Sequence, residues 1–317
     1  VERPVTSTLR RWYGRYQERS DRRSDDAGAA VARFRWGVIC TVTLCIAVLG
    51  GRISAFVSAE LRTSRVQPRP VLNVWSDSAS ERADSATCAE LSAKRFPMVI
   101  VLGQSNAASH GAKGSSNEAT WTYFDHRCGL RSDPLPGTTG SGASLWAHMS
   151  ATLRAETGIV PVIAPLAIGN TRISDWVEPG PLNTAFRQFL REARSSGLPI
   201  LAVAWQQGEA DMLRGTPQAS YRNSLGTLIR EISEAGIEAP IFIAKSTFCK
   251  RSGTPAVRRA IDRFLQGSAD RRVRPGPDTD HLVGDYRSDG CHFSQSGLMA
   301  AGKLWADSLA STLREQP

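Results

Sequence analysis

Short, continuous apolar runs recur through the C-terminal two thirds of the chain. They lie at 98–102, 160–163, 200–205 and 241–244. Runs of four to six apolar residues are typical of strands that are buried on both faces of a parallel sheet. We therefore predict a buried strand at each of the four runs.

Between these runs, apolar residues recur every three or four positions, which is the spacing of one helix face. The clearest stripe is Tyr221, Leu225, Leu228, Ile229 and Ile232. Further helices are predicted around 145–153, 186–193 and 298–313, and Asn183 is well placed to cap the second of these. Alternating strands and helices predict an α/β fold, a three-layer α/β/α sandwich with a parallel sheet.

The N-terminal part differs in composition. Residues 1–36 are rich in Arg, Asp and Ser and are predicted to be a disordered basic tail, and 58–95 read as a polar linker into a domain at 96–317. Residues 38–51 are apolar and flanked by arginines. Because fourteen helical residues reach only about 21 Å, a membrane span needs residues up to 57, with Arg52 extending to the interface.

Two interpretations of 37–57 remain open, both of which place the domain outside the cytoplasm. One is an uncleaved transmembrane signal anchor with its Arg-rich side in the cytoplasm. The other is a signal peptide cleaved after Ala59, which would release the domain to the periplasm or medium. A buried core helix is the third alternative, but the segment is apolar on every face.

Net charge narrows the class of partner. The chain carries a formal charge of +9, but ten Arg and five acidic residues already lie within residues 1–59. The domain itself is only mildly basic and has no basic run interleaved with aromatics, so no nucleic-acid partner is predicted. The excess charge beside an apolar segment favours a membrane as the partner of the N-terminal region.

Four of the six cysteines, Cys88, Cys128, Cys249 and Cys291, lie in the predicted exported part, where disulfides persist. Four cysteines allow three pairings. Proximity in the chain favours Cys88–Cys128 and Cys249–Cys291, with free buried thiols as the alternative. No Cys/His spacing indicates a zinc site, and no cofactor is predicted.

Four polar clusters follow predicted strands or precede the last helix. They are 103–106 (GQSN), 169–171 (GNT), 207–211 (QGEAD) and 289–292 (DGCH). Because the carboxyl ends of parallel strands meet at one edge of a sheet, the four clusters are expected to converge there.

These clusters hold a candidate nucleophile and base. Ser105 lies three residues after the first strand, in a turn that would expose its hydroxyl, which needs a base to become nucleophilic. Asp289 precedes His292 by three residues, a spacing that lets its carboxylate accept the Nδ1–H of the imidazole while Nε2 faces the serine. His110 follows Ser105 too closely in the chain to reach back easily. Taken alone, D-x-x-H is equally a loop hydrogen-bond motif.

Together, the clusters resemble the SGNH (GDSL-like) hydrolase superfamily, and within it the sialate O-acetylesterase and carbohydrate esterase family 6 branch. The resemblance is carried by VLGQSN (101–106), GNTRISDW (169–176), WQQGEAD (205–211) and D-x-x-H (289–292), and it spans roughly 97–313. It implies a flavodoxin-like fold and a serine esterase that removes O-acetyl groups from a carbohydrate through an acyl-enzyme intermediate, without a cofactor. A lipase, thioesterase or acyltransferase with the same triad, and a non-catalytic glycan-binding domain, are the alternatives.

Carried over residue by residue, the resemblance implies that Ser105 attacks the ester carbonyl, His292 acts as base and then acid, and Asp289 orients it. It implies an oxyanion hole made of the backbone N–H groups of Ser105 and Gly169 and the side-chain amide of Gln207. The alternative for Gln207 is a buried amide that ties two strand ends together.

Further polar residues are expected to support the site or contact the substrate: Gln104, Asn106, Asn170, Arg172, Glu209 and Asp211. Asn170 replaces a glycine that is usual in this branch. Arg172 is a cation that could bind an acidic sugar or a neighbouring carboxylate, or point to solvent. Glu209 and Asp211 are expected to cap the next helix or brace the site loops.

Overall fold

The computed structural model describes residues 87–114, 119–250, 255–314 and 72–74, and five positions near the start: Val5, Leu9, Trp12, Tyr13 and Tyr16. The chain divides into two compact units, Val1–Arg10 with Pro70–Pro317, and Arg11–Arg69. The architecture that follows is that of the first unit. Apart from those positions, the predicted tail (1–36), the membrane or signal segment (37–57) and most of the linker lie outside the described residues.

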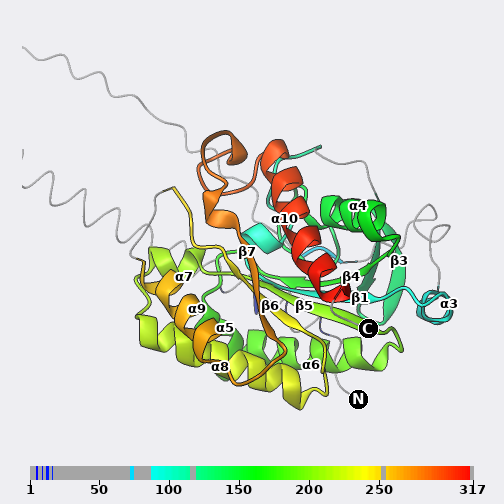
Figure 1. Ribbon diagram of the computed structural model, residues 1–317, viewed down its shortest axis with the longest axis horizontal. Helices are drawn as coiled ribbons and strands as arrows, with labels where there is room; N and C mark the ends of the chain where they lie inside the picture. The colour runs from blue at the N-terminus through cyan, green and yellow to red at the C-terminus, as the bar shows by residue number, and fades with distance from the viewer. Residues whose placement is uncertain are drawn as a thin grey trace, which may run out of the picture. The chain divides into compact units, whose positions relative to one another are not determined.

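A seven-stranded sheet forms the centre of the domain, in the order β3-β2-β4-β1-β5-β6-β7 (Figure 1). Its strands are β1 (Met98–Gly103), β2 (Thr120–Phe124), β3 (Arg127–Arg131), β4 (Val162–Ala167), β5 (Ile200–Gln206), β6 (Ile241–Lys245) and β7 (Val273–Asp278). All neighbours pair in parallel except β2 and β3, which form an antiparallel hairpin at one edge. The predicted parallel α/β sheet is therefore confirmed, with this hairpin as an addition.

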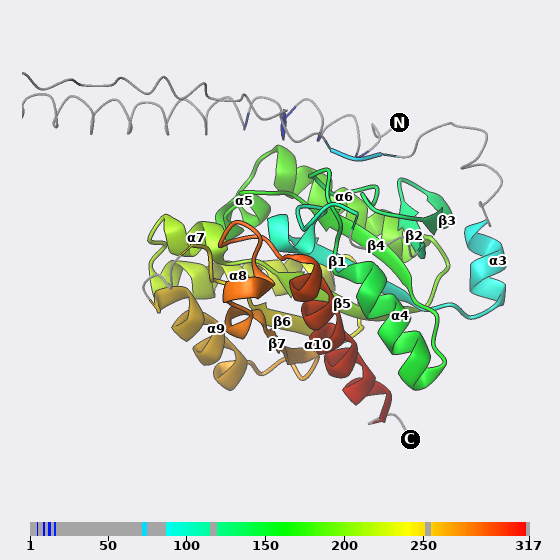
Figure 2. The ribbon, with the colours of Figure 1, turned by 90° about the horizontal axis from the view of Figure 1, so that it is seen from above.

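Helices cover both faces of the sheet and make the three layers. On one face α4 and α10 pack side by side, and α5, α6, α8 and α9 lie on the other (Figures 1 and 2). The helices are α3 (Cys88–Ala93), α4 (Trp146–Thr157), α5 (Ile173–Val177), α6 (Pro181–Ser195), α7 (Glu209–Leu213), α8 (Gln218–Glu234), α9 (Ala256–Gly267) and α10 (Gln295–Arg314). Among the described helices, none is long and apolar enough to cross a bilayer.

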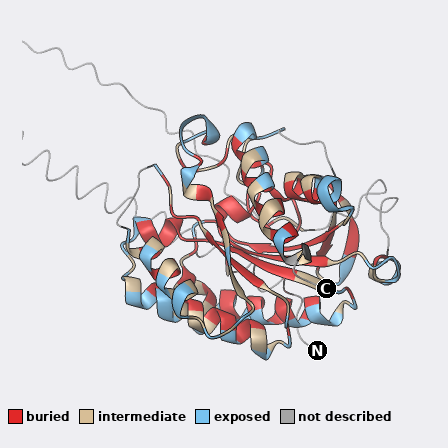
Figure 3. Ribbon diagram, viewed as in Figure 1, coloured by how far each residue is buried: buried red, intermediate tan, exposed pale blue. Residues whose placement is uncertain are grey.

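Strand β1 is the central strand, and every one of its residues is buried (Figure 3). Its side chains alternate between the two faces, and Val99 and Val101 join the core that α4 and α10 cover. Strand β4 lies on one side of β1 and strand β5 on the other. The direction in which successive strands are added to the sheet therefore reverses at β1. The carboxyl end of β1 is therefore the switch point at which α/β sheets bind their ligands.

Two indole rings anchor the α4–α10 face to the strand ends. Trp146 and Trp305 are fully buried, with ring centroids 5.5 Å apart. Trp146 donates its Nε1–H to the Ala107 carbonyl, and Trp305 donates to the side-chain oxygen of Gln206. Each ring thus fills the core and also fixes a residue next to a cluster of the candidate site.

Two details correct the sequence-based predictions. Strand β4 starts at Val162 and runs on to Ala167, whereas the prediction was 160–163, and its Pro165 pairs in register with Val101 of β1. Asn183 does not cap α6, which begins at Pro181 after Gly180. Its buried amide instead donates to the Trp176 carbonyl and to Glu231, which joins α5 to α8.

Part of the predicted linker packs against the domain. Asn73 donates its backbone N–H to the Thr138 carbonyl and its side-chain N–H to the Gly140 carbonyl, at 2.8 and 2.9 Å. Cys88, at the start of α3, forms a disulfide with Cys128 on β3, and Cys249 pairs with Cys291. This is the pairing that chain proximity favoured.

Truncation of one core side chain tests how much α10 contributes to the domain. Leu309 lies on α10 and is fully buried, so Leu309→Ala should lower the free energy of unfolding by about 2–5 kcal/mol, measured by urea denaturation. Met299 lies on the same helix but is 54% exposed. Met299→Ala is the matched control and should leave the free energy of unfolding nearly unchanged; equal losses in both variants would contradict this packing.

Candidate active site

The turn after β1 presents Ser105 at the switch point. Gly103 has φ +147°, and a Cβ there would collide with the Gln206 carbonyl, so glycine is required where the chain leaves the sheet. Ser105 opens the 3₁₀ turn η1 (Ser105–Ala107) and is 6% exposed. Its hydroxyl has no hydrogen-bond partner among the described residues.

Asp289 and His292 form a close pair in the loop before α10. Nδ1 of His292 lies 2.8 Å from Oδ2 of Asp289, and Oδ1 of the same carboxylate accepts the backbone N–H of His292 at 2.7 Å. Burial alone would raise the pKa of Asp289, but these bonds and the His292 charge lower it to about 2. The carboxylate therefore stays ionised and accepts a hydrogen bond from the Nδ1–H of His292, which leaves Nε2 free to act as a base.

The amide of Asn106 joins the serine turn to the histidine loop. Its Nδ2 donates to the Cys291 carbonyl at 3.2 Å and to Oε1 of Glu209 at 2.7 Å. The next residues run alongside the same loop, because the backbone N–H of Ala112 donates to the Phe293 carbonyl at 3.0 Å. The turn that carries Ser105 and the loop that carries Asp289 and His292 are therefore neighbours.

Glu209 lies beneath this junction as a buried acid. It is 1% exposed, and Ser246 also donates to its Oε1, at 2.8 Å. Its other oxygen, Oε2, has no hydrogen-bond partner among the described residues. Burial raises the pKa of Glu209 to about 7, although Asn106 and Ser246 partly stabilise the charged form. Glu209 braces the site, which is the role expected of it.

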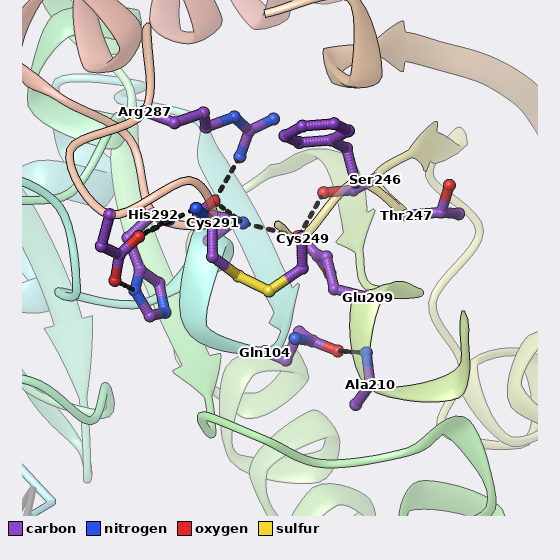
Figure 4. Close-up of a disulfide and its surroundings, with 12 residues drawn as sticks. Gln104, Glu209, Ala210, Ser246, Thr247, Cys249, Arg287, Cys291 and His292 are labelled. Atoms are coloured by element: carbon purple, nitrogen blue, oxygen red, sulfur yellow. Dashed lines mark hydrogen bonds and ion pairs between the residues drawn. A yellow bond between two sulfur atoms is a disulfide. The ribbon is translucent and has the colours of Figure 1, made fainter. Parts of the chain in front are cut away.

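The Cys249–Cys291 disulfide holds the histidine loop from the other side, directly beside His292 (Figure 4). The backbone N–H of Lys250 donates to the Gly290 carbonyl at 2.6 Å. Arg287 donates from Nη1 to the Cys291 carbonyl at 2.7 Å, the same oxygen that accepts from Asn106. The backbone immediately before His292 is thus fixed by one covalent link and several hydrogen bonds.

The second cluster follows β4. The backbone N–H of Gly169 donates to Oγ1 of Thr139 at 2.8 Å. Asn170 has φ +64°, and its side-chain oxygen accepts from Arg214 at 2.8 Å. Arg172 is partly exposed and lies 3.9 Å from Asp175, so its charge is paired only loosely.

Gln207 does not have the free amide that an oxyanion donor requires. Its Nε2 lies within hydrogen-bond distance of three acceptors, Oδ2 of Asp211 at 2.6 Å, the Thr171 carbonyl at 3.0 Å and Oε1 of Gln104 at 3.2 Å. An amide nitrogen carries only two hydrogens, and this side chain is fully buried. The geometry fits the alternative interpretation of Gln207, a buried amide that ties two strand ends together.

Gln104 and Asp211 complete this tie. Gln104 accepts the backbone N–H of Ala210 at 3.0 Å, which links the serine turn to α7. Asp211 accepts the backbone N–H of Ile173 at 2.8 Å, and burial raises its pKa. Both side chains are structural supports, as predicted for Asp211.

Two contributors were not anticipated from the sequence. Arg287 carries no motif, and its role follows only from its contact with Cys291. The His110 ring stacks on that of His292, with centroids 5.4 Å apart. Within residues 87–114, 119–250 and 255–314, no group of three or more His, Cys, Asp or Glu side chains could hold a metal ion.

Comparisons with known proteins show what the chain is similar to. A family model described as "Carbohydrate esterase, sialic acid-specific acetylesterase" matches residues 95–311. A probable carbohydrate esterase of Arabidopsis thaliana is 29% identical over 93 residues, 29% of this chain and 35% of that protein. The match therefore spans about a third of the length of this curated relative.

Solved structures share the fold. The X-ray structure of the Arabidopsis thaliana protein has a TM-score of 0.55 at 20% identity, with 68% of this chain and 98% of that chain covered. The crystal structure of NanS has a TM-score of 0.52 at 14% identity, with 69% and 98% covered. At these identities the likeness concerns the fold.

The raised pKa of Glu209 predicts a pH-dependent stability. Its pKa is about 7 in the folded protein against an ordinary 4.5, so its contribution to stability is fully present below pH 4.5 and is lost as pH rises through about 7. Glu209→Gln cannot ionise. Between pH 5 and pH 8, the free energy of unfolding of the wild type should therefore fall by about 2 kcal/mol relative to this variant, measured by urea denaturation.

Glu178 is exposed at the C-terminal end of α5 and gives the control, Glu178→Gln. Between pH 5 and pH 8, the free energy of unfolding of Glu178→Gln should change as that of the wild type does. If Glu209→Gln also follows the wild type, the buried acid does not titrate in this range.

Proposed function

The chain belongs to the carbohydrate esterase, sialic acid-specific acetylesterase family, and from this premise we propose that it removes O-acetyl groups from a carbohydrate with Ser105 as nucleophile. The observation that carries the proposal is the Asp289–His292 pair held beside the Ser105 turn. A carboxylate, an imidazole and an accessible serine hydroxyl are the groups that acyl transfer needs.

In the first half of the proposed reaction, Nε2 of His292 takes the hydroxyl proton as Oγ of Ser105 attacks the acetyl carbonyl carbon. Asp289 keeps Nδ1 protonated and stabilises the imidazolium. His292 then gives the proton to the sugar oxygen as the bond between that oxygen and the carbonyl carbon breaks. The products of this half are the free sugar hydroxyl and acetyl-Ser105.

In the second half, His292 takes a proton from water, and the resulting hydroxide attacks the acetyl-enzyme. The bond to Oγ of Ser105 breaks, Oγ regains the proton from His292, and acetic acid leaves and loses its proton to water. The proposed oxyanion donors are the backbone N–H groups of Ser105 and Gly169. Gly169 would exchange its bond to Thr139 for one to the oxyanion, and Gln207 is left out because its N–H groups are engaged.

The surroundings of Gly169 bear on the substrate. Arg172 is partly exposed and only loosely paired with Asp175, so it is available to a carboxylate of an acidic sugar.

We also propose that the domain acts outside the reducing cytoplasm, because it contains two disulfides. The anchor or signal role of 37–57 stays a prediction.

Ester hydrolysis by the full chain tests the proposal. The wild type should hydrolyse p-nitrophenyl acetate faster than p-nitrophenyl octanoate, and Ser105→Ala should lower kcat by about 1,000-fold or more, because the attacking oxygen is lost. Ser311→Ala, a change of an exposed serine on α10, is the control and should retain full activity.

A preference for octanoate would favour a lipase over an acetylesterase. Equal, negligible rates in the wild type and Ser105→Ala, with both folded by circular dichroism, would contradict the esterase proposal.

A further inference from the structure

We propose that His110 is a positioning residue of this active site, whose ring stacks on His292 and keeps that imidazole directed between Asp289 and Ser105. The inference rests on the proposed function and deepens it, because it concerns the same base. His110 lies outside the four polar clusters.

The two imidazole rings lie face to face. Their centroids are 5.4 Å apart and their planes differ by 23°, which is a stacked arrangement. The His292 side chain is 26% exposed, and the His110 ring lies against one of its faces.

The stack removes a motion that the Asp289 bond leaves open. A single hydrogen bond from Nδ1 to a carboxylate oxygen fixes one atom of the ring, and the ring can still tilt about that contact. A flat neighbour against one face prevents the tilt. Because Nε2 must meet Ser105 and then the leaving oxygen, a tilted ring would misplace the proton in both steps.

The structure is built closely around the His110 ring. Its Nε2 lies 3.0 Å from Oγ1 of Thr139, the hydroxyl that also accepts the Gly169 N–H. A Cβ added to Gly169 would lie 2.9 Å from Nε2 of His110, and one added to Gly140 would lie 2.7 Å from its Cδ2. Side chains at either glycine would therefore displace the ring from His292.

Charge favours this role for His110. The pKa of His110 is lowered to about 3, chiefly by burial and also by the charge of His292, while the carboxylate of Asp289 opposes both effects. His110 is therefore neutral at any pH at which His292 acts as a base. A neutral ring can lie against the imidazolium that forms in each catalytic cycle, whereas a second cation would repel it.

Three variants of the full chain separate the ring from its polar contact. His110→Phe keeps a flat ring and loses the bond to Thr139, His110→Gln keeps a polar group and loses the ring, and His110→Ala loses both. On p-nitrophenyl acetate, we expect kcat to fall about tenfold in the Gln and Ala variants and to stay within about threefold in the Phe variant. KM should change less than about twofold in all three, because His110 is proposed to act through His292.

Full kcat in His110→Gln, or a loss confined to KM, would overturn the proposal. If His110→Ala does not fold, the comparison of Phe with Gln decides, since both side chains fill the space.

A second measurement does not depend on turnover. The proton on Nδ1 of His292, bonded to Asp289, should give a strongly downfield NMR resonance in the wild type and in His110→Phe. In His110→Ala or His110→Gln, tilting of the ring should broaden it by exchange with water. An unchanged resonance in both would overturn the positioning role. If the wild type is inactive but the resonance still depends on the ring, the esterase proposal fails and the positioning of His292 stands.

Discussion

The side-chain amide of Asn106 is the contact on which the rest of the site depends. Through one nitrogen it joins the turn after β1 to Glu209, which begins the helix after β5, and to the backbone just before His292. A parallel sheet brings its strand ends to a common edge, but it does not fix the loops that extend from them. The amide supplies that fixation between two loops more than 180 residues apart in the chain. Arg287 and the disulfide act on the same short stretch of backbone, and Glu209 accepts a hydrogen bond from Asn106 itself.

The sequence predicted those parts of the fold whose physical cause is local. Continuous apolar runs identified β1, β4, β5 and β6, because strands with both faces covered by helices must be apolar throughout. The missed strands lie at or near the sheet edges. β7 reads VRPGPD and has no apolar run, since its pairing with β6 is made by the backbone. Asn183 has the side chain of a helix cap, but Pro181 starts the helix earlier and tertiary contacts with Trp176 and Glu231 engage its amide.

The site also has features that follow from local sequence and features that depend on tertiary contacts. The convergence of the four clusters was predictable, because it follows from the ends of neighbouring strands. The hydrogen-bond partners were not, because an amide such as that of Gln207 can serve a substrate or the protein equally well until its neighbours are known. His110 shows the limit most clearly. Its short separation from Ser105 argued against a role, yet the chain folds so that its ring reaches His292.

The Cys249–Cys291 disulfide restrains the histidine loop only where the surroundings are oxidising. It closes a loop of about 40 residues, which is worth roughly 4 kcal/mol in chain entropy, and it ends one residue before His292. A newly made chain in a reducing compartment carries two thiols there instead, and its histidine loop lacks that restraint. Oxidation therefore adds a covalent restraint to the loop that carries His292. A chain that gains its second disulfide only after export would be kept from the esters of the cell that makes it.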